Sequence, residues 1–94
     1  MNSKSVYKIP NGKLLKISLD YDKNTNKINN VRITGDFFAH PEESIELIEE
    51  ELINVKLDKI RLFETIQSVI DEYNIELIGL DAEGLTTGIL MCLK

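Results

Sequence analysis

The sequence predicts an α+β domain, a two-layer arrangement in which a small, mostly antiparallel sheet is covered by about three helices. Three observations support this prediction. Apolar and polar residues alternate in the first third of the chain, apolar residues recur at helical spacing in the middle, and a short apolar run precedes a last helical segment. The 94 residues fit one domain, spanning residues 1–94, with a single core.

The first two predicted elements form an antiparallel hairpin. Residues 13–21 alternate with the period of two that is typical of a half-buried strand. The apolar residues of one parity in this segment are Leu15, Ile17, Leu19 and Tyr21. Val31 and Ile33 alternate with polar neighbours and predict the second strand, after the turn-forming residues 22–27. Residues 6–9 predict only a short lead-in segment before the turn signal of residues 10–12.

An amphipathic helix is predicted over residues 41–53. Pro41 suits the first helical position, because the N–H that proline lacks has no helical partner there. Ile45, Ile48 and Leu52 recur at three- and four-residue spacing, while glutamates cover much of the remaining surface. Asn54 is expected to end this helix.

A second helix is predicted from Asp58, a good N-cap residue, to Asn74. Its expected apolar stripe consists of Ile60, Phe63, Ile66, Val69, Ile70 and Tyr73. The short, mostly apolar segment 75–80 then predicts a strand that is buried on both faces.

Asp81 is expected to cap a last helix that runs to about Leu93, with apolar positions spaced by four residues. Gly84 and Gly88 share a neighbouring stripe of this helix. Each glycine lowers helix stability by about 1 kcal/mol relative to alanine. Close backbone packing at these positions would offset that loss; otherwise the helix would be loose there.

The net charge of -5 is unevenly distributed along the chain. Residues 1–35 carry seven basic and two acidic residues, whereas residues 36–94 carry four basic and fourteen acidic ones, giving +5 and -10. A net acidic chain is a poor general ligand for nucleic acid, so no nucleic-acid partner is expected. The basic half is either a solvated edge of the hairpin or a surface that meets a small anion such as a phosphate.

The composition excludes several other classes of protein. The longest apolar run, residues 89–93, is far shorter than the about 20 residues of a membrane span, and no signal peptide is visible. Cys92 is the single cysteine, which excludes an internal disulfide and a metal site built from several thiolates of this chain. We therefore expect a cytoplasmic protein without a membrane partner.

The sequence carries none of the usual patterns of catalytic or metal-binding residues. The one histidine, His40, lies far along the chain from Cys92, which favours a surface histidine and a buried cysteine over a catalytic pair. The glutamates of residues 41–51 repeat as a solvent-exposed helix face does. No metal-ligand spacing and no phosphate-binding glycine loop occur.

The segment Gly35-Asp36-Phe37-Phe38 stands out at the exit of the hairpin. Two adjacent aromatic residues point to different faces of an extended segment, so only one of them needs to enter the core. Asp36 can hydrogen-bond the local backbone in a turn. The segment is either a well-formed strand-to-helix corner or a recognition loop beside the basic strand.

Three stretches together resemble the C-terminal accessory domain of lipoate–protein ligases: residues 10–14, 33–43 and 78–80. The similarity extends from about Tyr7 to Leu93, and Thr34-Gly35-Asp36-Phe37-Phe38 is its most specific part. The chain departs from the family at Asn54-Val55, where many relatives carry a glycine after the first helix. The resemblance implies a fold similar to that of iron–sulfur scaffold proteins. A scaffold function is disfavoured, because Cys92 offers a single thiolate ligand.

The resemblance implies that the module is either fused to a catalytic domain or forms a separate small subunit. We expect the separate small subunit here. As one half of a heterodimer, it would be required with the catalytic subunit for the activation of lipoate by ATP and Mg²⁺ to lipoyl-adenylate. The lipoyl group is then transferred to a lysine of a lipoyl carrier protein, which this chain would meet only indirectly. The chain would bind no cofactor and catalyse nothing by itself. The alternative is a non-catalytic tether that links the ligase to its acceptor protein.

The motif and the charge distribution together predict which residues face the partner and the adenylate. The carboxylate and the polyphosphate of the adenylation step repel each other, and lysines of the basic hairpin would offset that repulsion. The predicted residues are Gly12, Lys13, Lys16, Gly35, Asp36, Phe37 and Phe38. No catalytic residue and no metal ligand is expected within this chain.

Overall fold

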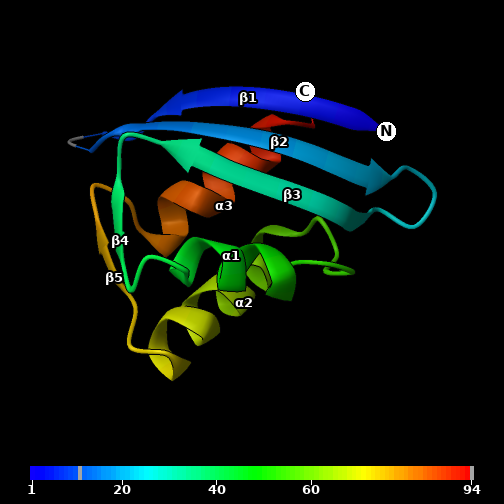
Figure 1. Cartoon of the computed structure of the whole chain (residues 1–94). Helices are drawn as coiled ribbons and strands as arrows, with labels where there is room; N and C mark the ends of the chain where they lie inside the picture. The colour runs from blue at the N-terminus through cyan, green and yellow to red at the C-terminus, as the bar shows by residue number, and fades with distance from the viewer. Residues whose placement is uncertain (11, 94) are drawn as a thin grey trace.

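A computed structural model describes residues 1–10 and 12–93 of the chain. Within these residues the fold is α+β, as predicted, with a sheet across one side and helices across the other (Figure 1). The elements in chain order are β1 (Asn2–Lys8), β2 (Leu14–Asp22), β3 (Lys27–Gly35), β4 (Phe38–His40), α1 (Ser44–Glu51), α2 (Lys59–Glu72), β5 (Glu76–Ile78) and α3 (Ala82–Met91).

The main sheet has the strand order β1-β2-β3, with both pairs antiparallel, so the predicted hairpin is confirmed. The predicted short lead-in is wrong, because β1 is a strand of seven residues that pairs along β2. Its inward-facing Ser3 and Ser5 donate hydrogen bonds from their hydroxyls to backbone carbonyls of the C-terminal segment. These polar inward residues give no apolar alternation, which is why the sequence pattern underestimates the strand.

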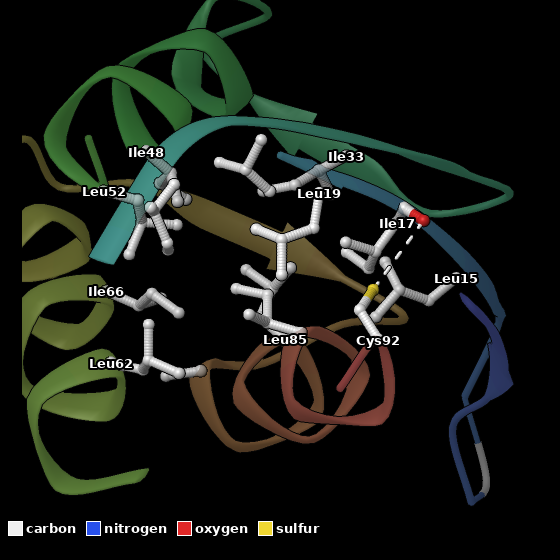
Figure 2. Close-up of a cluster of buried hydrophobic side chains, with 14 of the residues drawn as sticks. Leu15, Ile17, Leu19, Ile33, Ile48, Leu52, Leu62, Ile66, Leu85 and Cys92 are labelled. Atoms are coloured by element: carbon white, nitrogen blue, oxygen red, sulfur yellow. Dashed lines mark hydrogen bonds between the residues drawn. The ribbon is translucent and has the colours of Figure 1, made fainter. Parts of the chain in front are cut away.

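The core lies between the inner face of this sheet and the helices (Figure 2). Helix α3 packs on β1 and β2, α1 packs on β3, and α2 packs against the other two helices. The largest fully buried apolar side chains are Leu15, Ile17, Leu19, Ile28, Ile48, Leu52, Leu62, Ile66, Leu85 and Ile89. They come from both layers, so the domain is held together mainly by apolar burial.

Helix α1 begins at Ser44 and not at Pro41 as predicted. The N–H of Ser44 donates to the carbonyl of Pro41 at 3.0 Å, so a tight turn precedes the first regular helical turn. Glu49 of this helix accepts a hydrogen bond at 2.7 Å from the backbone N–H of Ile33 on β3. Asn54, the predicted stop, lies two residues beyond the helix cap in the left-handed conformation, with φ of 70°.

Helix α2 confirms its predicted start, since the Asp58 carboxylate accepts from the N–H of Arg61 at 3.1 Å. The predicted stripe is partly wrong, because Ile60, Phe63 and Tyr73 are exposed. The buried residues of α2 are Leu62, Ile66 and Val69. The apolar residues of α2 fall on two neighbouring stripes. Because α2 packs against α1 and α3, only the stripe that contains its buried residues faces them.

The prediction for residues 75–80 is corrected by the structure. Only Glu76–Ile78 form a strand, β5, and it pairs with β4 in a separate two-stranded sheet. Glu76 and Ile78 are exposed and Leu77 is half-buried, so the strand is covered on one face only. Leu77 packs against the core, so one face of the ribbon is covered and the other faces solvent.

Helix α3 is capped as predicted, since the Asp81 carboxylate accepts from the N–H of Gly84 at 2.7 Å. Its glycines allow close packing and do not loosen the helix. A Cβ atom at Gly88 would lie 2.8 Å from Leu15 Cδ2. Leu93 follows the end of the helix and is 37% exposed, so it does not extend the apolar stripe as predicted.

Candidate functional site

Three segments that are far apart in the sequence meet at one end of the main sheet. We call this surface the motif corner and define it as residues 12–14, 35–38 and 78–79. The backbone N–H of Asp36 donates to the carbonyl of Leu14 at 3.1 Å, and the N–H of Lys13 donates to the carbonyl of Gly79 at 3.2 Å. Figure 1 shows this convergence on the left, where β4 and β5 lie beside the ends of β2 and β3.

Two glycines make this close approach possible. A Cβ atom at Gly35 would collide with the carbonyl oxygen of Leu14, and Gly35 has a φ of 154°. A Cβ atom at Gly79, whose φ is 85°, would lie 2.5 Å from Lys13 Cγ. Side chains at either position would meet both backbone strain and a steric clash. The glycines therefore let β2 meet the β3–β4 connection and let the Lys13 side chain lie over the backbone after β5.

Lys13 and Asp36 present opposite charges at the motif corner, and both residues are exposed. Among residues 1–10 and 12–93, neither side chain forms an ion pair. The Asp36 side chain, which can hydrogen-bond its local backbone in a turn, makes no hydrogen bond with any described group. Its backbone N–H instead donates to Leu14. Both charged groups are therefore open to solvent and available to an incoming partner.

As predicted, only one of the two aromatic residues packs against the core. Phe37 is half-buried and packs against the core, whereas Phe38 is 69% exposed. Phe38 lies opposite Ile78 in the pairing of β4 with β5, and Ile78 is 55% exposed. The two side chains line a shallow hollow of about 490 Å³ together with residues of both strands. The motif corner thus combines an exposed apolar pair with a free lysine and a free aspartate.

Of the seven predicted site residues, the structure brings together Gly12, Lys13, Gly35, Asp36, Phe37 and Phe38. The N–H of Gly12 donates to the carbonyl of Ile9 at 2.8 Å and so closes the turn that carries Lys13. Lys16 lies elsewhere: it is exposed on the outer face of the main sheet, opposite Val6 and Thr34.

Sequence reasoning missed three residues of the motif corner as site residues: Leu14, Ile78 and Gly79. For Ile78 and Gly79 the only available signal was the late Ile78-Gly79-Leu80 stretch of the family resemblance. Nothing in the periodicity could show that this stretch pairs with the segment after β3, because the pairing joins residues about forty positions apart.

Cys92 is buried against the inner face of the sheet, close to Ser5 and Ile17 (Figure 2). Burial raises the pKa of its thiol, and a hydrogen bond with Ser5 opposes that effect more weakly. A neutral, buried thiol is a poor nucleophile. His40 is exposed on β4, as expected for a surface histidine.

No cluster of three or more metal-ligating side chains is found among the residues that the structure describes. Within the same residues, none of the helices combines the length and apolarity needed to cross a bilayer. The feature that distinguishes the domain is therefore the motif corner, an exposed surface where the ends of several strands and their connections meet.

Comparison with known proteins identifies the class to which this fold and corner belong. The family described as bacterial lipoate protein ligase C-terminus matches residues 7–86, and the chain belongs to this family. The matched region contains every residue of the motif corner.

Two comparisons, both with Thermoplasma acidophilum proteins, are more specific. The lipoate-protein ligase A subunit 2 of this organism is 40% identical over 47 residues, which are 50% of this chain and 48% of the relative. The aligned segment thus spans about half of that relative's length. A chain from the structural analysis of an archaeal lipoylation system, a bi-partite lipoate protein ligase and its E2 lipoyl domain, has a TM-score of 0.80 at 27% identity. That match covers 95% of this chain and 94% of the other.

Proposed function

We propose that this chain is the accessory subunit of a two-part lipoate–protein ligase, required with the catalytic subunit for the ATP-dependent activation of lipoate. The observation that supports this most is the convergence of the Gly35–Phe38 motif with Lys13 at one exposed corner. Membership of the ligase C-terminal family and the similarity to a ligase subunit support the same proposal. The chain would form a heterodimer with the catalytic subunit and would catalyse nothing alone.

The geometry favours a covering role over a catalytic one. The hollow at the motif corner is shallow and open, and its lining residues are mostly exposed. Such a surface cannot enclose a substrate by itself, but it can close a cleft on another protein. Closure excludes water, which strengthens electrostatic interactions and protects a reactive adenylate from hydrolysis.

Lys13 is the residue that would assist adenylation most directly. In this step the lipoate carboxylate attacks the α-phosphorus of ATP, an acyl-adenylate bond forms, and pyrophosphate leaves. Both reactants are anionic, so a positioned cation stabilises the charge that they bring together. The Lys13 stem rests on Gly79 and its ammonium carries no ion pair within residues 1–10 and 12–93, so the group is placed and free. Mg²⁺ and the lipoate pocket would be supplied by the catalytic subunit.

Phe38 and Ile78 would supply the apolar contact that holds the two subunits together. Both are exposed and line the same hollow, and burying apolar surface is the main source of affinity in stable subunit contacts. Asp36, which is exposed two residues before Phe38, would fix the orientation by accepting hydrogen bonds from the partner or forming an ion pair with it.

The two half-reactions, measured separately, test the proposal. The catalytic subunit is assayed with and without this chain, first for pyrophosphate release from ATP and lipoate, then for lipoyl transfer from preformed lipoyl-adenylate to the carrier protein. Stimulation of pyrophosphate release supports the proposed function. Stimulation of transfer alone would support the tether function instead.

A further inference from the structure

Among the residues that the structure describes, no helix covers the outer face of the β1–β2–β3 sheet, since α1 and α3 pack on its inner face (Figure 1). The even-numbered residues of β1 and β2 point outward, as do Arg32 and Thr34 of β3, and most of them are exposed. None of the outward residues on these strands is aromatic. This face is therefore mostly polar, although Val6 is 61% exposed on it, and it adjoins the motif corner at Leu14.

Three cations lie next to one another on this face. The strand register places Lys4 opposite Ser18 and Ser18 opposite Arg32, so one row across the sheet has a cation at each end. Lys16 occupies the centre of the next row, diagonal to both cations. All three are exposed, and none forms an ion pair within residues 1–10 and 12–93. We call Lys4, Lys16 and Arg32 the cation triad.

This concentration of positive charge contrasts with the rest of the chain. The protein carries 16 acidic residues and a net charge of -5, yet no carboxylate stands between the triad residues. Asp20, the acidic residue nearest along β2, is bound to the N-terminal amine at 3.3 Å. The three cations occupy diagonal positions and not directly opposite ones, so their mutual repulsion in water is weak and an acidic partner could pair with all of them.

The shape of this face favours a protein over a small anion. The hollow beside the triad is an open groove of about 360 Å³ on a sheet surface, and a small anion there would remain largely hydrated. An acidic protein surface can contact all three cations at once. Nucleic acid fits less well, since the chain is net acidic and the face lacks aromatic residues for stacking.

We infer that the cation triad is a docking surface for an acidic face of the carrier protein that accepts the lipoyl group, an inference that rests on the proposed function. It replaces the indirect contact with the carrier that the sequence resemblance implies by a direct one. Exposed charges accelerate encounter and give weak, salt-sensitive binding. These properties suit a protein substrate that must leave after each turnover. The apolar Phe38–Ile78 pair instead suits the lasting contact with the catalytic subunit, so the two surfaces serve two different partners.

The test measures lipoyl transfer in the reconstituted ligase as a function of carrier concentration, with the charge-reversal variant Lys4→Glu/Arg32→Glu. We expect the KM for the carrier to rise about tenfold, because exposed charge pairs contribute modestly and reversal adds repulsion. Pyrophosphate release without carrier should be unchanged. The difference should shrink toward 1 M salt, where charges are screened within about 3 Å. Thermal melting of the variant verifies that it is folded.

The matched control is Lys23→Glu/Lys56→Glu, which makes the same change in net charge at exposed positions outside the triad. An equal rise in KM for both variants, or no rise for the triad variant, would overturn the inference. A fall in pyrophosphate release would also overturn it, because the face would then belong to the catalytic subunit's interface. Duplex DNA that binds the triad more tightly than the carrier does would assign the face to nucleic acid instead.

A direct titration of this chain with the carrier protein separates this inference from the proposed function. If the chain binds the carrier through the triad but does not stimulate pyrophosphate release, only the proposed function is contradicted. Stimulation without triad-dependent carrier binding would contradict only the docking inference.

Discussion

The side chain of Lys13 lies directly over the backbone of Gly79, and the N–H of Lys13 donates to the Gly79 carbonyl at 3.2 Å. This contact joins the turn before β2 to the residue after β5. It gives the lysine a fixed direction at the motif corner, although its ammonium is exposed.

Gly79→Ala should displace Lys13. The new Cβ would lie 2.5 Å from Lys13 Cγ, at a φ of 85° that L side chains rarely adopt. We expect about 1–2 kcal/mol of lost stability together with reduced stimulation of pyrophosphate release. Chemical denaturation and the half-reaction assay measure the two effects. Asn26→Ala is the matched control, because Asn26 also has a positive φ, of 59°, but lies at the far hairpin tip. It should lose similar stability and keep full stimulation; equal loss of stimulation would contradict the role of the contact.

Phe38→Ser should weaken the heterodimer without destabilising the chain. Phe38 is already 69% exposed, so the fold loses little apolar burial. Removing an aromatic anchor from an interface costs about 2 kcal/mol or more, roughly a thirtyfold loss in affinity. Calorimetric titration with the catalytic subunit measures this loss. Ile60→Ser, at a residue that is 67% exposed on α2, serves as the control and should retain wild-type affinity. The opposite ranking of the two variants would place the interface on α2.

Gly88→Ala should destabilise the domain even though alanine favours helices. The new Cβ would lie 2.8 Å from Leu15 Cδ2, and Leu15 is fully buried and cannot move aside. Overpacking costs about 1–3 kcal/mol, whereas the gain in helix propensity is about 1 kcal/mol. We expect a net loss near 1 kcal/mol in urea unfolding. A stabilised variant would show that α3 does not pack tightly on β2.

The thiol of Cys92 should make stability depend on alkaline pH. Burial raises its pKa above the ordinary value of 9.0, so the folded state favours the neutral thiol. This contribution is complete below the pKa of the unfolded chain and is lost as the pH rises through the folded pKa. Unfolding free energy should therefore fall above pH 9.0 relative to Cys92→Ala. Parallel pH profiles for the two proteins would show that the thiol is not desolvated.

The elements that were predictable from the sequence are those whose periodicity is set by one buried face. The alternation through Ile17 and Leu19 identified β2, and the carboxylates of Asp58 and Asp81 marked two helix starts, because each satisfies a free backbone N–H. The full length of β1 was not predictable, since its inward Ser5 bonds a helix carbonyl and breaks the apolar pattern.

The candidate site was predictable only in part. Local motif residues such as Gly35 and Phe38 were found because they are consecutive in the sequence and match a known family. Gly79 was missed as a site residue because its role arises from a long-range contact with Lys13. Lys16 was grouped with Lys13 by charge alone, whereas the pleat of β2 turns its side chain to the outer face.

The central claim is that the motif corner promotes the activation of lipoate. The most direct measurement is the rate of pyrophosphate release by the catalytic subunit with ATP and lipoate, in the presence of wild-type chain, Lys13→Ala or Asp36→Ala. Lys23→Ala at the hairpin tip is the control. We predict that the wild-type chain and the control stimulate release equally, whereas the two corner variants lose about tenfold or more of the stimulation. Wild-type rates with both corner variants would contradict the claim.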